Sequence, residues 1–220
     1  MKQKQYIQWV EFYEPWIKSM EAAAFAIHDR VNQKYDNVLP YGFHLKLTAS
    51  YVSKYAHEVV ADETDLLILY AAAYLHDCIE DARMSYNDLV RFIREFNPEV
   101  QPLSKEMKTR LETEVPEIVY ALTNEKGRDR KERANERYYA GIRATRFAPF
   151  VKLCDRLANI RYTTLFFFTN RMLEIYQQEH STFMASIESP AEPLPTAMKQ
   201  EAQELLKSEC YRLSQQVVND

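Results

Sequence analysis

One short segment of the chain gathers four ionisable side chains directly after a run of three alanines, within residues 71–81. On a helix, His76 would share a face with Glu80, because the two are four residues apart. The same spacing relates Asp77 to Asp81. Such groups beside apolar residues are costly to desolvate unless a cation or strong hydrogen bonds compensate them. We therefore expect this segment to bind a metal ion.

Two further residues could complete a metal site. His44 lies at the start of a predicted helix, and Asp155 lies in an otherwise apolar helical stretch, with Asn159 one turn further on. With His76 and Asp77, the site would offer two imidazoles and two carboxylates. Mixed nitrogen and oxygen donors suit Mn²⁺, Fe²⁺ or Zn²⁺ better than Mg²⁺ or Ca²⁺. Such an ion lowers the pKa of a bound water and supplies hydroxide near neutral pH.

The order of these ligands resembles the H…HD…D pattern of the HD superfamily of metal-dependent phosphohydrolases. Four blocks, residues 40–44, 75–81, 122–126 and 152–161, are similar to the hydrolase domain of RelA/SpoT enzymes, and most similar to their small, free-standing alarmone hydrolases. The similarity spans about residues 20–187. It implies a multi-helix HD-domain bundle and release of pyrophosphate from the 3′ position of guanosine-3′,5′-bis(diphosphate), ppGpp.

The resemblance also implies a role for each matching residue. Four side chains would bind the metal, which is Mn²⁺ in this family: His44, His76, Asp77 and Asp155. Two acidic side chains would be catalytic, because they would position or activate the attacking water: Glu80 and Asp81. Polar and basic side chains would bind the nucleotide: Lys34, Asn159, Lys126, Arg130 and Arg133. Arginine in particular can hold phosphate oxygens in a bidentate fashion.

Two residues depart from the family pattern. Gln33 stands where an arginine that packs on the guanine base is expected, and Leu45 replaces the proline that usually follows the first histidine. Gln33 favours an alternative in which the same chemistry acts on another nucleotide, as in a 5′-nucleotidase or an NADPH phosphatase. A third hypothesis is a non-catalytic domain that binds a nucleotide as a sensor.

The elements that must position these residues are predicted to be helices throughout. No two-residue alternation persists, so we expect an all-α fold. Pro15 and Pro116 should interrupt their helices, and residues 34–42 should form a loop. Two shorter helices should run from a cap near Asp62 to the His76 cluster and from Ser85 to Phe96. The other predicted helices cover about residues 6–33, 44–60, 104–123, 129–143, 148–169, 171–187 and 197–216.

Length and composition set limits on the organisation of the chain. It has 220 residues, of which 46% are hydrophobic, and this suits one domain of ordinary size. We expect the HD phosphohydrolase domain over residues 1–187, with residues 188–220 forming a linker and a C-terminal helix that pack on it. About thirty residues after position 187 leave no room for a synthetase domain, so we expect no alarmone synthesis.

Composition also argues against several functional classes. The formal net charge is −4, which provides no basic surface for nucleic acid. The N-terminus lacks an apolar signal core, and no stretch is apolar and long enough to span a bilayer. We therefore expect a cytoplasmic protein without membrane contact, whose partner is a small nucleotide substrate. Three widely separated cysteines form no disulfide framework. The sequence does not indicate an oligomeric state.

Overall fold

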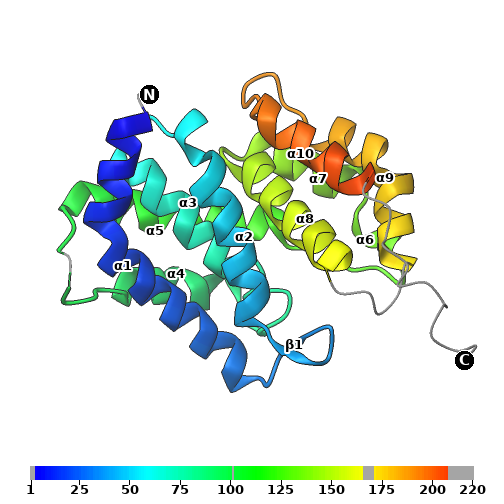
Figure 1. The fold of residues 1–220 in the computed structure, drawn as a ribbon. Coiled ribbons are helices and arrows are strands. Elements are labelled where there is room, and N and C mark those ends of the chain that lie inside the picture. The colour runs from blue at the N-terminus through cyan, green and yellow to red at the C-terminus, as the bar shows by residue number, and fades with distance from the viewer. Residues whose placement is uncertain (1–2, 101, 166–170, 208–220) are drawn as a thin grey trace, which may run out of the picture.

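The computed structural model describes residues 3–100, 102–165 and 171–207. The described chain is mostly helical, which confirms the predicted all-α class (Figure 1). Its elements are α1 Gln3–Arg30, β1 Lys34–Tyr35, β2 Leu39–Pro40, α2 Gly42–Tyr55, the 3₁₀ helix η1 Ala56–Glu58, α3 Glu63–Leu75, α4 Tyr86–Glu95, α5 Lys105–Leu122, α6 Arg130–Arg133, α7 Glu136–Ala144, α8 Ala148–Leu165, α9 Arg171–Ile187 and α10 Thr196–Lys207.

Helix α3 forms the centre of the core. Every residue from Thr64 to Leu75 is buried, as expected for a helix that is apolar on all sides. Helices α1, α2, α5 and α8 pack around it. Asp62 caps its N-terminus by accepting a hydrogen bond from the amide of Asp65 at 2.8 Å. This burial fixes the position of the residues that follow Leu75, which carry the candidate chemistry.

The predicted helix from a cap near Asp62 to the His76 cluster is confirmed, but the helical spacing assumed for His76 to Asp81 is wrong. Helix α3 ends at Leu75, and residues 76–81 form hydrogen-bonded turns. The amide of Cys78 donates to the carbonyl of Leu75 at 3.0 Å, and the amide of Asp81 donates to that of Asp77 at 2.8 Å. A polar segment cannot extend through the apolar core at low cost, so the backbone turns where the ionisable residues begin.

The predicted proline interruptions are also wrong. Helix α1 continues through Pro15, and α5 continues through Pro116. Glu11 and Pro15 both lie on the exposed side of α1, where solvent can satisfy the carbonyl that loses its amide partner. Buried residues before and after Pro15, including Tyr13 and Trp16, hold the helix against the core. Tertiary packing here outweighs the local cost of proline.

Two other segments differ in detail from the prediction. The loop at residues 34–42 contains an antiparallel pair of two-residue strands, β1 and β2. Its turn places Asp36 and Asn37 at positive φ, a conformation that these residue types tolerate. The predicted helix over 129–143 is divided into α6 and α7, because Asn135 caps a new helix. The predicted ends of two helices, at 166–169 and 208–216, lie outside the described residues.

The C-terminal part of the described chain packs on the same body as the rest. Helix α10 contacts both α8 and α9 (Figure 1). Among the described residues, no helix combines the length and the apolar character that crossing a membrane would require.

Candidate metal centre

Four side chains from three parts of the chain converge at one end of the core. His44 lies in the first turn of α2, His76 and Asp77 directly follow α3, and Asp155 lies in the middle of α8. The Nε2 atoms of the two histidines are 3.2 Å apart. His76 Nε2 lies 2.9 Å from Asp77 Oδ2 and 3.8 Å from Asp155 Oδ1. His44 Nε2 lies 3.5 Å and 3.3 Å from the same two oxygens.

This arrangement fits a divalent cation. Donor atoms of His44, His76 and Asp77 all lie within 4.8 Å of one another, and Asp155 adds a carboxylate oxygen 3.3 Å from His44 Nε2. Two imidazoles and two carboxylates are ordinary ligands for Mn²⁺, Fe²⁺ or Zn²⁺. The converging atoms are nitrogen and oxygen lone pairs, which repel one another unless a proton or a metal ion lies between them. The donor set therefore fits the predicted ion.

The electrostatics of the cluster agree with this description. Burial alone would lower the pKa of His76, but Asp77 and Asp155 outweigh it and hold that pKa well above its usual value. Burial would raise the pKa of Asp77, yet the two histidines hold it well below its usual value. The carboxylates are therefore ionised and the histidines attract protons. A bound cation would take the place of those protons.

Neighbouring groups orient the ligands. His76 Nδ1 lies 2.8 Å from the carbonyl oxygen of Ala73, which holds a proton on Nδ1 and leaves Nε2 directed at the cluster. Lys152 Nζ lies 3.0 Å from Asp155 Oδ2. The side-chain amide of Asn159 donates to Asp155 Oδ1 at 2.6 Å. Each interaction fixes the direction of one donor before any ion binds.

The β1–β2 hairpin is attached to this centre. The hydroxyl of Tyr35 donates to Asn159 Oδ1 at 2.7 Å, and the ring of Tyr35 stacks on His44 with the centroids 4.8 Å apart. The hydroxyl of Tyr162 in α8 donates a hydrogen bond to Asp36 Oδ2 of the hairpin turn at 2.8 Å. The hairpin therefore covers one side of the first ligand and connects it to α8.

A single phenol joins the metal cluster to the acidic pair. The hydroxyl oxygen of Tyr41 lies 2.5 Å from Asp77 Oδ2 and 2.6 Å from Asp81 Oδ2. Burial and the two carboxylates raise the pKa of Tyr41, so the phenol keeps its proton. One proton serves only one acceptor, so the second contact needs a proton on a carboxyl group. Burial and Asp77 raise the pKa of Asp81, so Asp81 takes up a proton more readily than Asp77, whose pKa is lowered.

Replacing Tyr41 with phenylalanine should weaken metal binding. The substitution keeps the ring, which stacks on the buried His28 with centroids 4.4 Å apart, and removes only the donor to Asp77. Loss of a hydrogen bond to a ligand typically costs about 10- to 100-fold in metal affinity, and we expect a loss in that range by Mn²⁺ titration. Tyr6→Phe is the control, because the Tyr6 hydroxyl donates to backbone carbonyls away from the site. Equal affinities of the two variants would contradict this role.

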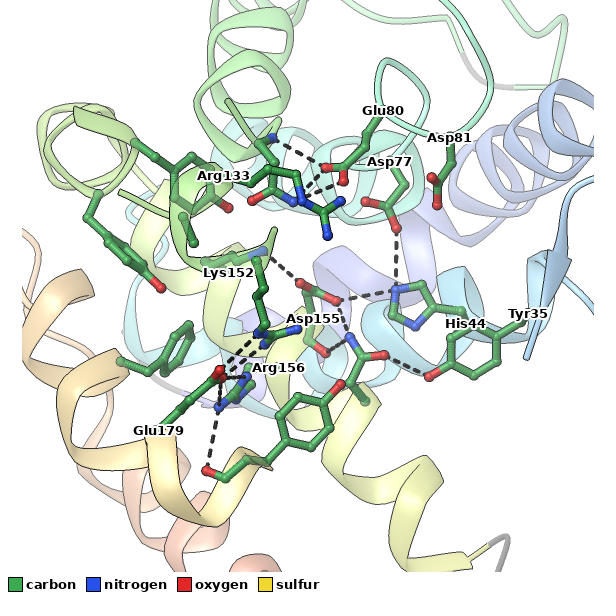
Figure 2. A pocket seen from close by; sticks show the side chains of 18 of the residues that line it. Tyr35, His44, Asp77, Glu80, Asp81, Arg133, Lys152, Asp155, Arg156 and Glu179 are labelled. Atoms are coloured by element: carbon green, nitrogen blue, oxygen red, sulfur yellow. Dashed lines mark hydrogen bonds and ion pairs between the residues drawn. The ribbon is translucent and has the colours of Figure 1, made fainter. Parts of the chain in front are cut away.

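The second predicted catalytic acid, Glu80, lies in the same pocket and contacts a different partner. Both of its carboxylate oxygens accept hydrogen bonds from the side-chain amide of Asn124, each at 2.9 Å. Glu80 and Asp81 are thus held by separate groups, one by an amide and the other by a phenol. The structure brings both acids to the rim of the metal cluster (Figure 2).

The cluster opens into a pocket of about 440 Å³. Asp77, Glu80 and Asp81 lie at the end near His44, whereas Arg130 and Arg156 meet Glu179 at the opposite end (Figure 2). In Figure 2, Asp155 lies between two sets of side chains. One is Asp77, Glu80 and Asp81, and the other is the pair formed by Arg156 and Glu179. The basic side chains that line the pocket are Arg130, Arg133, Lys152 and Arg156. A pocket with an acidic end that can hold a cation and a basic opposite end suits an elongated, polyanionic ligand.

The predicted nucleotide contacts are only partly gathered in this pocket. Asn159, Arg130 and Arg133 line it, whereas Lys34 and Lys126 are not among the described residues that do. Asn159 is engaged by Tyr35 and Asp155 rather than free. Sequence reasoning did not single out the roles of four lining residues: Tyr41, Lys152, Arg156 and Glu179. Three of these lie inside the sequence blocks that carry the resemblance, which was the available signal.

Comparisons with known proteins add no assignment. Neither a protein-family model nor a curated protein matches this chain.

Proposed function

We propose that this protein is a metal-dependent phosphohydrolase of the HD type that acts on a nucleotide phosphate ester. The observation that carries the proposal is the convergence of His44, His76, Asp77 and Asp155, whose facing atoms lie 2.9 to 3.8 Å apart. A pocket of about 440 Å³ with a basic far end supports an anionic organic substrate. The ordered ligand pattern in the sequence supports the same chemistry.

The residues of the chain would divide the work as follows. His44, His76, Asp77 and Asp155 would hold a divalent ion, most suitably Mn²⁺, which when bound polarises a phosphoryl oxygen and acidifies a water. Glu80 would orient or deprotonate the attacking water from its position beside Asn124. Asp81, whose pKa is raised by burial and by Asp77, would hold a proton for transfer.

Basic residues would neutralise the phosphate groups of the substrate. Among the described contacts of Arg133, its Nε reaches the carbonyl of Asp129 at 3.4 Å, a weak hydrogen bond that a phosphate oxygen could replace. Lys152 lies beside Asp155 and would act on the phosphoryl group nearest the cluster. The substrate we favour is ppGpp, which would lose its 3′-diphosphate as pyrophosphate. The four sequence blocks support this choice.

A second candidate substrate is another phosphorylated nucleotide, such as NADPH or a nucleoside monophosphate. Lys34 is exposed and Gln33 is half-buried, and neither is among the described residues that line the pocket. The arginine expected to pack on guanine is thus absent at Gln33, and Lys34 lies away from the described pocket lining. This favours the same phosphohydrolase chemistry with a different base or sugar.

A panel assay distinguishes these substrates. Phosphate and pyrophosphate release would be measured from ppGpp, NADPH and nucleoside monophosphates, with Mn²⁺ and with chelator. We expect Mn²⁺-dependent pyrophosphate release from ppGpp. Orthophosphate release from another nucleotide of the panel, with ppGpp left intact, would support the phosphohydrolase activity and exclude ppGpp as the substrate. Nucleotide binding without metal-dependent turnover of any member would contradict the enzyme and favour a sensor.

A further inference from the structure

The basic end of the pocket already contains a carboxylate. Glu179 of α9 accepts two hydrogen bonds from the guanidinium of Arg130, from Nε at 3.0 Å and from Nη2 at 3.1 Å. The guanidinium of Arg156 also reaches Glu179 Oε2, at 3.3 Å and 3.2 Å. One carboxylate thus bridges two arginines that come from α6 and α8.

Arg156 is held more rigidly than the carboxylate, whereas Arg130 is half exposed. Arg156 is only 5% exposed, and its guanidinium lies over the rings of Tyr176 and Phe183 at 4.1 Å and 4.7 Å. The side chain of Glu179 is 38% exposed. It can therefore rotate into water at a modest cost, whereas Arg156 cannot leave its aromatic surroundings without losing its packing.

The charges at this end are not balanced. Two guanidinium groups face one carboxylate, and the Nε of Arg156 is buried without a hydrogen-bond partner in the described part of the chain. Arginine forks bind phosphate oxygens with the geometry that they use for carboxylates. A phosphate group, with more oxygens and more charge than a carboxylate, would satisfy both arginines better than Glu179 does.

We propose that Glu179 occupies an anion subsite formed by Arg130 and Arg156, and that a second phosphate group of the substrate displaces it. The class of ligand is a nucleotide with two separated phosphate groups. One would react at the metal cluster, and the other would exchange with Glu179 at the opposite end of the pocket. The position of the reacting group rests on the proposed function, but the exchange at Glu179 does not.

This exchange gives the pocket selectivity. A ligand without a second anionic group cannot compete with the attached carboxylate, so Glu179 stays in place and narrows the basic end. A ligand with a phosphate group there gains two charge-assisted contacts and releases Glu179 to solvent. Glu179 is therefore a specificity-determining residue that disfavours ligands with one phosphate group.

The test measures pyrophosphate binding to the full chain in chelator, where no metal-dependent turnover occurs. Isothermal titration would compare wild type, Glu179→Gln and Arg130→Gln. Glu174→Gln is the matched control, because Glu174 is an exposed glutamate of α9 that is not among the described residues lining the pocket. We expect Glu179→Gln to bind inorganic pyrophosphate about tenfold more tightly than wild type, Glu174→Gln to match wild type, and Arg130→Gln to bind weakly.

Thermal unfolding gives a second, independent measurement. Without Glu179 the buried Arg156 lacks its carboxylate, so Glu179→Gln and Glu179→Ala should unfold at a lower temperature than wild type. Pyrophosphate should raise the unfolding temperature of these variants more than it raises that of wild type. Equal or weaker pyrophosphate binding by both variants would overturn the proposal. A double variant, Glu179→Gln with Arg130→Gln, that still binds pyrophosphate more tightly than wild type would also overturn it. Because these measurements need no metal, their outcome is separate from that of the hydrolase assay.

Discussion

Replacing Asp155 with alanine is expected to abolish metal-dependent hydrolysis and to leave the helical fold in place. Asp155 Oδ1 lies 3.3 Å from His44 Nε2 and 3.8 Å from His76 Nε2, so its removal takes away one of two carboxylate donors. Loss of a group that only supports a ligand costs about 10- to 100-fold. Loss of the ligand itself should exceed this, and we expect turnover to fall by more than about 100-fold with any substrate that the wild type hydrolyses.

Two checks make this result interpretable. Circular dichroism should show the same helical content in Asp155→Ala as in wild type. Asp29→Ala should keep full activity, because Asp29 is an exposed carboxylate that is not among the described residues lining the pocket. Metal-dependent turnover by Asp155→Ala near the wild-type rate would remove Asp155 from the site and would contradict the proposed ligand set.

The largest effect on stability is expected at Asp65, far from the candidate chemistry. Asp65 is 0% exposed. Its carboxylate accepts hydrogen bonds from Arg110 at 2.6 Å and from Arg146 at 2.8 Å with each oxygen. The amide of Ala61 donates to it at 2.9 Å. This carboxylate joins the start of α3 to α5 and to the segment that precedes α8.

The substitution Asp65→Asn keeps the shape and removes the charge that both arginines need. Breaking a buried ion pair from one side typically costs about 3–5 kcal/mol, and we expect the free energy of unfolding in urea to fall by that amount. Asp62→Asn is the control. Asp62 also pairs with Arg110, at 3.0 Å, but its side chain is 52% exposed. Asparagine caps helices well, so the control should lose less than about 1 kcal/mol.

The effect of Asp65→Asn should depend on pH. Burial would raise the pKa of Asp65, but Arg146, the Ala61 amide and Arg110 hold it below the usual value of 3.8. Because the folded-state pKa is lowered, the contribution of this carboxylate is complete above the unfolded value and disappears as the pH falls through the folded value. The difference between wild type and Asp65→Asn should therefore be constant near neutral pH and shrink below 3.8. A difference that stayed constant through this range would contradict the assigned ion pair.

Much of the fold could be predicted from local sequence signals. Periodicity and caps gave helix α9 as 171–187 and α5 within one residue at each end. The predicted start of α4 at Ser85 is correct, because Ser85 and Asp88 form a capping box there. These signals act over one or two helical turns, so they are visible without tertiary information.

Other features depend on packing that a local pattern does not contain. The continuation of α1 through Pro15 requires the core contacts of Trp16. Helix α3 ends at Leu75 because the buried core ends there. The four-residue spacing of His76 and Glu80 was therefore a misleading signal of a helix. The division between α6 and α7 had a visible signal, because Asn135 is a good capping residue, and the charge pattern around it obscured this.

The candidate site shows the same contrast. The four candidate metal ligands stay a prediction, which the resemblance makes by sequence position, and the structure brings their side chains together. Tyr41 and Glu179 contact partners that are distant in sequence, so only the folded chain shows these contacts. Lys152 contacts Asp155 three residues later on the same helix, a pairing that helical spacing could have indicated. Lys34 was predicted to bind the nucleotide because it is basic. It lies in β1 of the hairpin and is not among the described residues that line the pocket.

The most direct test of the central claim does not require the substrate to be known. Mn²⁺ would be titrated into chelator-stripped protein, and free Mn²⁺ would be followed by electron paramagnetic resonance, for wild type and Asp155→Ala. We expect one tightly bound ion per wild-type chain and loss of that ion in the variant. Absence of a stoichiometric site in wild type, or equal binding by both proteins, would contradict a metal centre formed by His44, His76, Asp77 and Asp155.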